Sequence, residues 1–265
     1  MIKLIVSDVD GTLVPEGTND IHPEIFNIIR KLKKLGIYFV VASGRHKSCI
    51  DKMFEPVKED IFYVTSNGAY IGTYNKQMAV FDLEPEVYKQ LFHDFDTEIK
   101  QPYYAETTQN AYSKYPDPSF IEFMNTSYGY DMKACTTMDI IDEPIIKTAF
   151  RHSEGVSNID PKWFKKWNKL CKAVISGSHW VDFIPLNINK GTSVSKLQEL
   201  LGVTIHETLA FGDQVNDIEM LKQAYYSFAV DNASSTVKNA ARFTCDSCAD
   251  QGVLKTLNQI FSECL

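Results

Sequence analysis

Two acidic side chains lie two residues apart near the start of the chain, at Asp8 and Asp10. They follow an apolar run at residues 4–6 and precede the turn-forming pair Gly11 and Thr12, which is typical of the end of a buried strand. Side chains two residues apart on an extended segment share a face, so their charges repel unless a divalent cation lies between them. The pattern predicts a Mg²⁺ site, because Mg²⁺ prefers carboxylate oxygens together with waters and a substrate phosphate. The alternative is an acidic strand end that is solvated in a loop.

Three more segments place polar residues directly after an apolar run. They are Ser43-Gly44-Arg45, Asn189-Lys190-Gly191, and the stretch 212–217 with Asp213, Asn216 and Asp217. An open α/β sheet gathers its reactive groups at the carboxyl ends of its strands, so we expect the four segments to form one active site. Taken singly, each has a plain structural explanation. Ser43 could cap the following helix, Lys190 could be a solvated first-turn residue, and the acids of the last segment could be ordinary loop residues.

The elements between these segments alternate between strand and helix, as in a doubly wound sheet. A strand near 3–7, a helix over 23–35 and a strand at 37–42 form a βαβ unit. Pro23 suits the first turn of this helix and Gly36 suits its end. The further elements predicted in this alternation are helices over 46–54, from 190, and over 216–223, 234–241 and 251–262, and strands at 61–64, 208–211 and 226–230.

Residues 82–185 interrupt the alternation and are richer in aromatic and turn-forming residues. The sequence therefore predicts an α/β protein with a doubly wound, mainly parallel, Rossmann-like sheet formed by residues 1–81 and 186–265, and an inserted α+β domain over 82–185. Helices are expected near 85–94, 118–127 and 160–170, and strands near 145–150, 173–176 and 180–184. Most aromatic residues of the insertion are expected in a hydrophobic core, with one or two facing a ligand. They are Tyr103, Tyr104, Tyr112, Tyr115, Tyr128, Tyr130, Trp163, Trp167 and Trp180.

The composition is that of a globular protein without a charge signature for nucleic acid. Apolar residues make up 44% and charged residues 23% of the 265 residues, which is enough to build a sizeable core. With 27 Lys and Arg against 34 Asp and Glu, the net charge of -7 predicts neither a nucleic acid nor a membrane partner. A basic leader and a membrane-length apolar run are both lacking, so a cytoplasmic location is expected.

Six scattered cysteines in a chain without a secretory signal favour reduced thiols over a disulfide framework. Cys245 and Cys248 form a CxxC pattern. Zinc sites usually take four ligands, and neither a second CxxC nor a nearby His pair completes such a set. The CxxC is therefore expected in a plain loop rather than in a metal or redox site.

In order and chemistry, the four polar segments resemble the motifs of the haloacid dehalogenase superfamily. The pattern is most similar to the Cof-type phosphatases with a C2B cap, which share DxDGTL, a Ser/Thr-Gly-Arg after the second strand, NKG and GDxxND. The segments 66–69 (Ser-Asn-Gly-Ala) and 232–233 (Asn-Ala) fit the same family, while the inserted domain matches the cap in position and size. Gln214 stands where the family often has small or amide residues, and Asp231 stands where it often has glycine. Neither departure removes a catalytic group.

The resemblance implies three catalytic residues. Asp8 would attack phosphorus and become an aspartyl-phosphate, and Lys190 would neutralise the approach of two negative groups. Asp10 would protonate the departing oxygen and then accept a proton from the hydrolytic water. An acid at this position also argues against the dehalogenase branch, because cleavage of a carbon–halogen bond needs no protonated leaving oxygen.

The resemblance also implies how ion and substrate are held. Mg²⁺ would be bound by the carboxylates of Asp8 and Asp213 and by the backbone carbonyl of Asp10. The residues expected to support these ligands are Asp217 and Thr12. The residues expected to bind the substrate phosphate are Ser43, Gly44, Arg45 and Asn216.

The sequence therefore predicts a Mg²⁺-dependent phosphatase that hydrolyses a small phosphorylated metabolite, with a sugar phosphate as the default substrate. Pyridoxal phosphate, flavin mononucleotide and other small monoesters remain open. One alternative is a phosphohexose mutase of the same superfamily, which would return the phosphoryl group to the sugar. Another is a protein that binds a phosphorylated ligand without catalysis. A signalling receiver domain agrees less well, because its acidic pair is usually adjacent and its fold lacks an insertion of this size.

Overall fold

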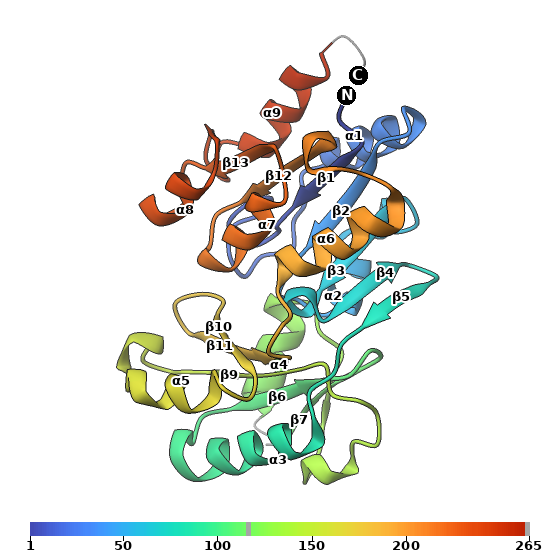
Figure 1. The fold of residues 1–265 in the computed structure, drawn as a ribbon. Helices are drawn as coiled ribbons and strands as arrows, with labels where there is room; N and C mark the ends of the chain where they lie inside the picture. The colour runs from blue at the N-terminus through green and yellow to red at the C-terminus, as the bar shows by residue number, and fades with distance from the viewer. Residues whose placement is uncertain (115–117, 263–265) are drawn as a thin grey trace.

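The computed structural model describes residues 1–114 and 118–262, and Figure 1 shows that they build two separate sheets. The first sheet lies in the part of the molecule that contains the first and the last described segments of the chain, and the second lies in the inserted part. From edge to edge, the first sheet consists of β14 (Phe243–Cys245), β13 (Tyr226–Val230), β12 (Thr208–Gly212), β1 (Leu4–Ser7), β2 (Tyr38–Ala42), β3 (Ile61–Thr65), β4 (Tyr70–Thr73) and β5 (Gln77–Val80).

The first sheet is mainly parallel, as predicted. Neighbouring strands from β14 to β3 run parallel, and β4 and β5 add an antiparallel edge. The chain proceeds from β1 outward to β2 and β3, and it later returns on the other side of β1 through β12, β13 and β14. The strand order therefore reverses between β1 and β12. Open α/β sheets bind their ligands at such a switch point, outside the carboxyl ends of the strands.

Helices accompany the first sheet in two groups. In the first group, α6 contacts α7 and α7 contacts α8. In the second group, α1 contacts α9. The bounds are α1 (Pro23–Lys34), α2 (Lys47–Met53), α6 (Lys190–Leu201), α7 (Ile218–Lys222), α8 (Ser235–Ala240) and α9 (Gly252–Ile260). In α1 the buried residues Ile25, Ile28, Ile29 and Leu32 repeat at helical spacing and form its apolar face. Among the described residues, no helix has both the length and the apolar character needed to cross a membrane.

The second sheet is mostly antiparallel and has helices of its own. Its strands, in spatial order, are β10 (Lys172–Ile175), β11 (Trp180–Ile184), β9 (Lys147–Arg151), β6 (Tyr103–Glu106), β7 (Ala111–Ser113) and β8 (Met132–Ala134). The helices are α3 (Pro85–Asp94), α4 (Pro118–Ser127) and α5 (Pro161–Trp167). One apolar core joins the sheet to α3 and α5 around Phe95, Phe150 and Trp167. A second core joins Tyr104 and Trp180 to α4 and to Cys49 of the first part.

The observed elements agree with most predicted ones and correct others. The helix predicted over 160–170 ends at Trp167, because the Asn168 side chain turns to accept the backbone N–H of Ala173 at 3.0 Å. The helix predicted over 216–223 is a 3₁₀ turn at Val215–Asp217 followed by α7. The strands β4, β5, β6, β7, β8 and β14 were not expected, and each has only three or four residues.

The boundaries of the inserted domain stay a prediction. We place them at residues 82 and 185, because β5 of the first sheet ends at Val80 and α3 begins at Pro85. On the other side, β11 of the second sheet ends at Ile184 and α6 begins at Lys190. Two short connections therefore join the two parts.

Candidate active site

Two neighbouring strands bring Asp8 and Asp213 to the same edge of the first sheet. β1 and β12 pair in parallel, and the Asp8 N–H donates to the Phe211 carbonyl at 3.1 Å. Asp217 follows in the turn after β12. Each of the three aspartates offers a carboxylate oxygen, and these oxygens lie within 4.8 Å of one another. All three side chains are buried, so the structure gathers three negative groups out of water at the switch point.

The start of α6 places Lys190 among these acids. The side chain of Asn189 caps the helix, and Lys190 is its first residue. The Lys190 ammonium donates to Asp8 Oδ1 at 2.6 Å and to Asp217 Oδ1 at 2.7 Å. A Cβ at Gly191 would collide with the backbone of α7, so glycine is required for this close helix contact. The three consecutive residues thus have separate roles. Asn189 caps the start of α6, Lys190 supplies a cation, and Gly191 allows α6 to lie close to α7.

The charges of this cluster do not balance. Burial raises the pKa of Asp8 well above its ordinary value, Asp217 raises it further, and Lys190 opposes both in part. Burial and the charge of Asp217 also raise the pKa of Asp213 to about 7. Burial lowers the pKa of Lys190, but attraction to Asp217 and Asp8 outweighs this and raises it. Three acids around one ammonium leave excess negative charge, and oxygen ligands at this spacing fit a divalent cation.

Several groups hold the Asp213 carboxylate in place. The Thr12 hydroxyl donates to its Oδ1 at 2.9 Å, and the Gln214 amide donates to its Oδ2 at 3.1 Å. Gly11 has a φ of +80°, and a Cβ there would collide with the Asp213 carboxylate. The other oxygen of Asp217 accepts the backbone N–H groups of Asp213 and Gln214, both at 3.0 Å. Thr12 therefore holds the Asp213 side chain, and Asp217 holds the Asp213 backbone.

Asp10 is held by Arg45 rather than by the cluster around Asp8. The guanidinium donates twice, from Nε to Oδ2 at 2.8 Å and from Nη2 to Oδ1 at 2.6 Å, and the Gly17 N–H adds a bond of 3.2 Å. Arg45 is only 3% exposed and also donates to the Tyr128 carbonyl of the inserted domain at 3.3 Å. The bidentate pair orients the Asp10 carboxylate, so Arg45 has a second partner besides the phosphate that the sequence predicts for it.

Of the remaining predicted phosphate-binding residues, Ser43 and Gly44 follow β2, and Asn216 lies in the turn after β12. Ser43 is fully buried, and its hydroxyl accepts the Arg45 N–H at 3.1 Å. The Asn216 amide donates to Asn67 Oδ1 at 3.1 Å, while Asn216 Oδ1 is buried without a hydrogen-bond partner among the described residues. Gly44, Arg45 and Asn216 line the pocket described next, whereas Ser43 is not part of its wall.

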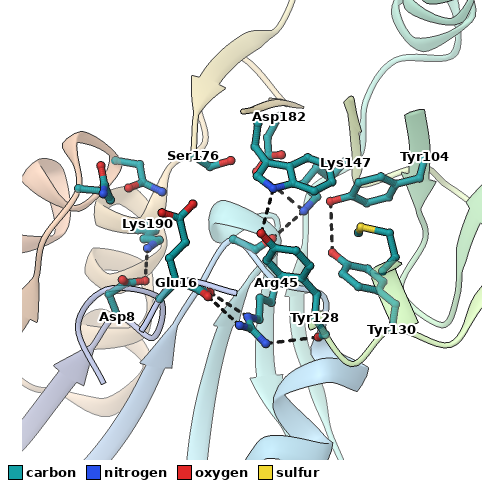
Figure 2. Close-up of a pocket in the computed structure, with 16 residues that line it drawn as sticks. Asp8, Glu16, Arg45, Tyr104, Tyr128, Tyr130, Lys147, Ser176, Asp182 and Lys190 are labelled. Carbon is teal, nitrogen blue, oxygen red and sulfur yellow. Dashed lines mark hydrogen bonds and ion pairs between the residues drawn. The ribbon is translucent and has the colours of Figure 1, made fainter. Parts of the chain in front are cut away.

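A pocket lies between the switch point and the inserted domain (Figure 2), and its empty space amounts to about 570 Å³ when the solvent at its open mouth is included. Asp8, Asp10 and Lys190 line it from the first sheet. Lys147 and Asp182 line it from the second sheet, and sequence reasoning missed both. A signal was present, because Lys147 is the one charged residue of the predicted strand 145–150 and Asp182 is the one charged residue of 180–184.

The aromatic residues of the insertion lie partly in its core and partly at the pocket. Tyr104, Tyr128, Tyr130 and Trp180 line the pocket, which is more rings than the one or two expected. Tyr103 and Trp167 are buried in the core of the inserted domain. Tyr115 lies outside the described residues.

Residues 5–257 match the haloacid dehalogenase-like hydrolase family. The chain belongs to this family. This haloacid dehalogenase-like hydrolase is 27% identical over 262 residues to the 5-amino-6-(5-phospho-D-ribitylamino)uracil phosphatase YbjI of Escherichia coli, covering 98% of this chain and 96% of the relative. It is 26% identical over 257 residues to the phosphatase of the same name, YcsE, of Bacillus subtilis, covering 97% and 94%. A crystal structure from Eubacterium rectale shares its fold with a TM-score of 0.86 and 32% identity, covering 98% and 99%.

The family, its phosphatase relatives and the inserted second sheet confirm the resemblance to the Cof-type branch with a cap. This haloacid dehalogenase-like hydrolase is a phosphatase, that is, a phosphoric monoester hydrolase that acts on phosphorylated metabolites. The inserted domain is accordingly called the cap below, and the rest of the chain the catalytic core.

The CxxC pattern of this haloacid dehalogenase-like hydrolase differs in part from its prediction. Cys245 ends strand β14 instead of lying in a loop, because its backbone pairs with β13, and Cys248 is buried in the turn that follows. Burial raises the pKa of each thiol to about 11. Within residues 1–114 and 118–262, no group of three metal-binding side chains includes either cysteine. Cys264 lies outside the described residues.

Proposed function

We propose that this phosphatase hydrolyses small phosphorylated metabolites through an aspartyl-phosphate formed on Asp8, with Mg²⁺ as its cofactor. The observation that carries the proposal is the buried ion pair of Asp8 and Lys190 at 2.6 Å, next to two further acids at the switch point. A carboxylate attacks a phosphate dianion poorly because both are negative. Lys190 supplies positive charge beside the attacking oxygen, which supports Asp8 as the nucleophile.

The Mg²⁺ ligands that we assign are the carboxylates of Asp8 and Asp213 and the backbone carbonyl of Asp10. The raised pKa values of Asp8 and Asp213 support this assignment, since both groups would ionise more readily beside a divalent cation. When bound, Mg²⁺ would supply positive charge that neutralises the phosphate oxygens. Thr12 would support the site by holding Asp213, and Asp217 by holding Lys190.

In the proposed reaction, Asp8 forms a bond to phosphorus while the bond to the leaving alcohol oxygen breaks and Asp10 gives that oxygen a proton. Asp10 then takes a proton from the water that attacks the aspartyl-phosphate, which releases inorganic phosphate and restores Asp8. The bidentate contact with Arg45 fixes the orientation of the Asp10 carboxylate. We expect the substrate phosphate to compete with Asp10 for the Arg45 guanidinium.

The phosphate is proposed to bind Ser43, Gly44, Arg45 and Asn216. The Ser43 hydroxyl accepts from the Arg45 N–H, so its own proton remains to donate to a phosphate oxygen. Gly44 and Asn216 line the pocket. The cap rings Tyr104 and Trp180 suit a substrate whose organic part presents a flat or apolar face.

A phosphate-release panel tests the proposed function. It compares 5-amino-6-(5-phospho-D-ribitylamino)uracil, the compound after which two relatives are named, with sugar phosphates, pyridoxal phosphate and flavin mononucleotide. We expect sustained phosphate release with Mg²⁺ and a loss of at least about 100-fold with a chelator, because the buried acids then repel the substrate. Release that is unaffected by the chelator would contradict the metal assignment. Isomerised sugar phosphate without free phosphate would instead indicate the mutase.

Asp10→Asn should slow turnover most for substrates with poor leaving groups. An alkoxide must be protonated as it departs, whereas an aryl oxygen leaves without that help, so we expect a loss of about 100-fold or more for a sugar phosphate and a much smaller loss for an aryl phosphate. Rates for both substrate types are measured on the same preparation. Equal losses for the two types would count against Asp10 as the acid.

A further inference from the structure

We infer that Lys147, a cap residue at the start of β9, is a positioning residue that orients the phosphate-binding loop of the core. The inference rests on the proposed function, because it takes Ser43 and Gly44 as the phosphate-binding residues. Figure 2 shows Lys147 and Tyr104 on one side of the pocket and Asp8 with Lys190 on the other. Lys147 therefore lies across the pocket from the nucleophile, and we infer that it acts through a core group that its ammonium contacts.

That group is the peptide between Gly44 and Arg45. The Lys147 ammonium donates to the Gly44 carbonyl at 2.6 Å. This carbonyl and the Arg45 N–H belong to one planar peptide group, so fixing one fixes the other. The Arg45 N–H donates to the Ser43 hydroxyl oxygen at 3.1 Å. A contact from the cap thus sets the direction of the hydroxyl that is proposed to donate to the phosphate.

The two neighbouring carbonyls of the same loop are also held, by the turn after β3. The Asn67 N–H donates to the Ser43 carbonyl at 3.0 Å, and the Ser66 N–H donates to the Arg45 carbonyl at 2.9 Å. Three consecutive carbonyls of the loop therefore have fixed partners, and the middle one depends on Lys147. Ser66 and Asn67 have φ values of 51° and 55°, which residues other than glycine adopt only when their surroundings hold them there.

Two cap carboxylates hold Ser66 and Asn67 in this conformation, and both also pair with Lys147. Glu106 accepts the Ser66 hydroxyl at 2.5 Å, and Asp182 accepts the Asn67 amide at 2.5 Å. The Lys147 ammonium lies 2.8 Å from Glu106 and 3.8 Å from Asp182. Lys147 is 1% exposed and Glu106 is fully buried, so this charge network lies between cap and core out of water. We infer that the phosphate-binding loop has this shape only while the cap contacts the core.

Binding of inorganic phosphate, measured by calorimetry with Mg²⁺, tests the role of Lys147. Lys147→Met keeps an unbranched side chain that is one heavy atom shorter, and it removes the donors. We expect the Kd for inorganic phosphate to rise at least about tenfold, and KM to rise by a similar factor for a sugar phosphate and for p-nitrophenyl phosphate. Lys133→Met, on the exposed face of the cap strand β8, should change neither value.

Two more variants separate positioning from cap stability. Lys147→Met leaves Glu106 buried without its cation, so the double variant Lys147→Met, Glu106→Gln removes both charges and should bind phosphate as weakly as the single variant. Glu106→Gln alone keeps the bond from Lys147 to Gly44 and an acceptor for the Ser66 hydroxyl, and it should raise the Kd for phosphate clearly less than Lys147→Met does. Thermal unfolding of each variant reports its fold separately.

Three outcomes would overturn the inference. They are phosphate binding restored in the double variant, an equal loss in Glu106→Gln alone, and a rise in KM confined to the sugar phosphate. The last outcome would make Lys147 a contact of the leaving group. If the wild type released no phosphate from any ester, the proposed function would fail, whereas the comparison of phosphate affinities would still decide the role of Lys147.

Discussion

Asp8→Asn is expected to reduce Mg²⁺-dependent phosphate release by at least about 1,000-fold, because the substitution removes the attacking charge while keeping the size of the side chain. The fold should remain intact, since an asparagine oxygen can still accept from Lys190 and the repulsion with Asp213 and Asp217 falls. Phosphate release under saturating substrate measures the effect, and circular dichroism checks the fold.

The matched control is Asp20→Asn, which makes the same change at an exposed aspartate and should leave the rate unaltered. An Asp8→Asn variant that turns over at the wild-type rate would contradict the nucleophile. Water would then have to attack the phosphate directly, and the acidic cluster would act only as a metal site.

Lys190→Met is expected to have the second largest effect and to change both activity and stability. It removes the ammonium that lies 2.6 Å from Asp8 and 2.7 Å from Asp217, and it leaves these buried carboxylates without their cation. We expect turnover to fall at least about 100-fold. The free energy of unfolding should fall by about 3–5 kcal/mol, the usual cost of removing one partner of a buried ion pair. Denaturant titration in the presence of a chelator measures the second effect.

Lys196→Met is the matched control for this prediction. It changes an exposed lysine of the same helix, whose partner is Glu199, and surface pairs of this kind contribute little to stability. If Lys190→Met lost stability but kept its turnover, Lys190 would be a structural cation that holds Asp8 and Asp217 together. The neutralising role in catalysis would then pass to another group.

Polar contacts join the cap to the core on both sides of the pocket. Arg45 joins Asp10 to the Tyr128 carbonyl of the cap, and Lys147 joins the cap to Gly44. Residues on both sides of the pocket thus hold groups that are proposed to act on the phosphate. We therefore expect the shape of the phosphate-binding loop to depend on contacts from both domains and not on the core alone.

Much of the core could be predicted from the sequence, because its signals are local. Each of these signals depends on neighbours a few residues away. They are the apolar run before Asp8, the buried face of α1 and the helix-capping Asn189 before Lys190. Parallel strands also place their carboxyl ends at one edge, so polar residues after separate strands were expected to meet. For the same reason, Asp213 could be assigned to the site of Asp8 before their distance was known. Lys190 instead follows β11 of the second sheet, and its assignment depended on the resemblance to the family.

Only the tertiary structure decided which partners the buried charges have. Lys147 and Gly44 are 103 residues apart, and Asn67 and Asp182 are 115 apart, so no local pattern connects them. The sequence shows Lys147 and Asp182 merely as charges inside apolar strands, which fits several arrangements. Short antiparallel strands such as β6 and β7 were missed for a related reason, because three or four residues carry too little periodicity and the pairing comes from chain reversal. Local periodicity determines an element and its buried face, whereas the partner of a buried charge depends on how the cap is seated on the core.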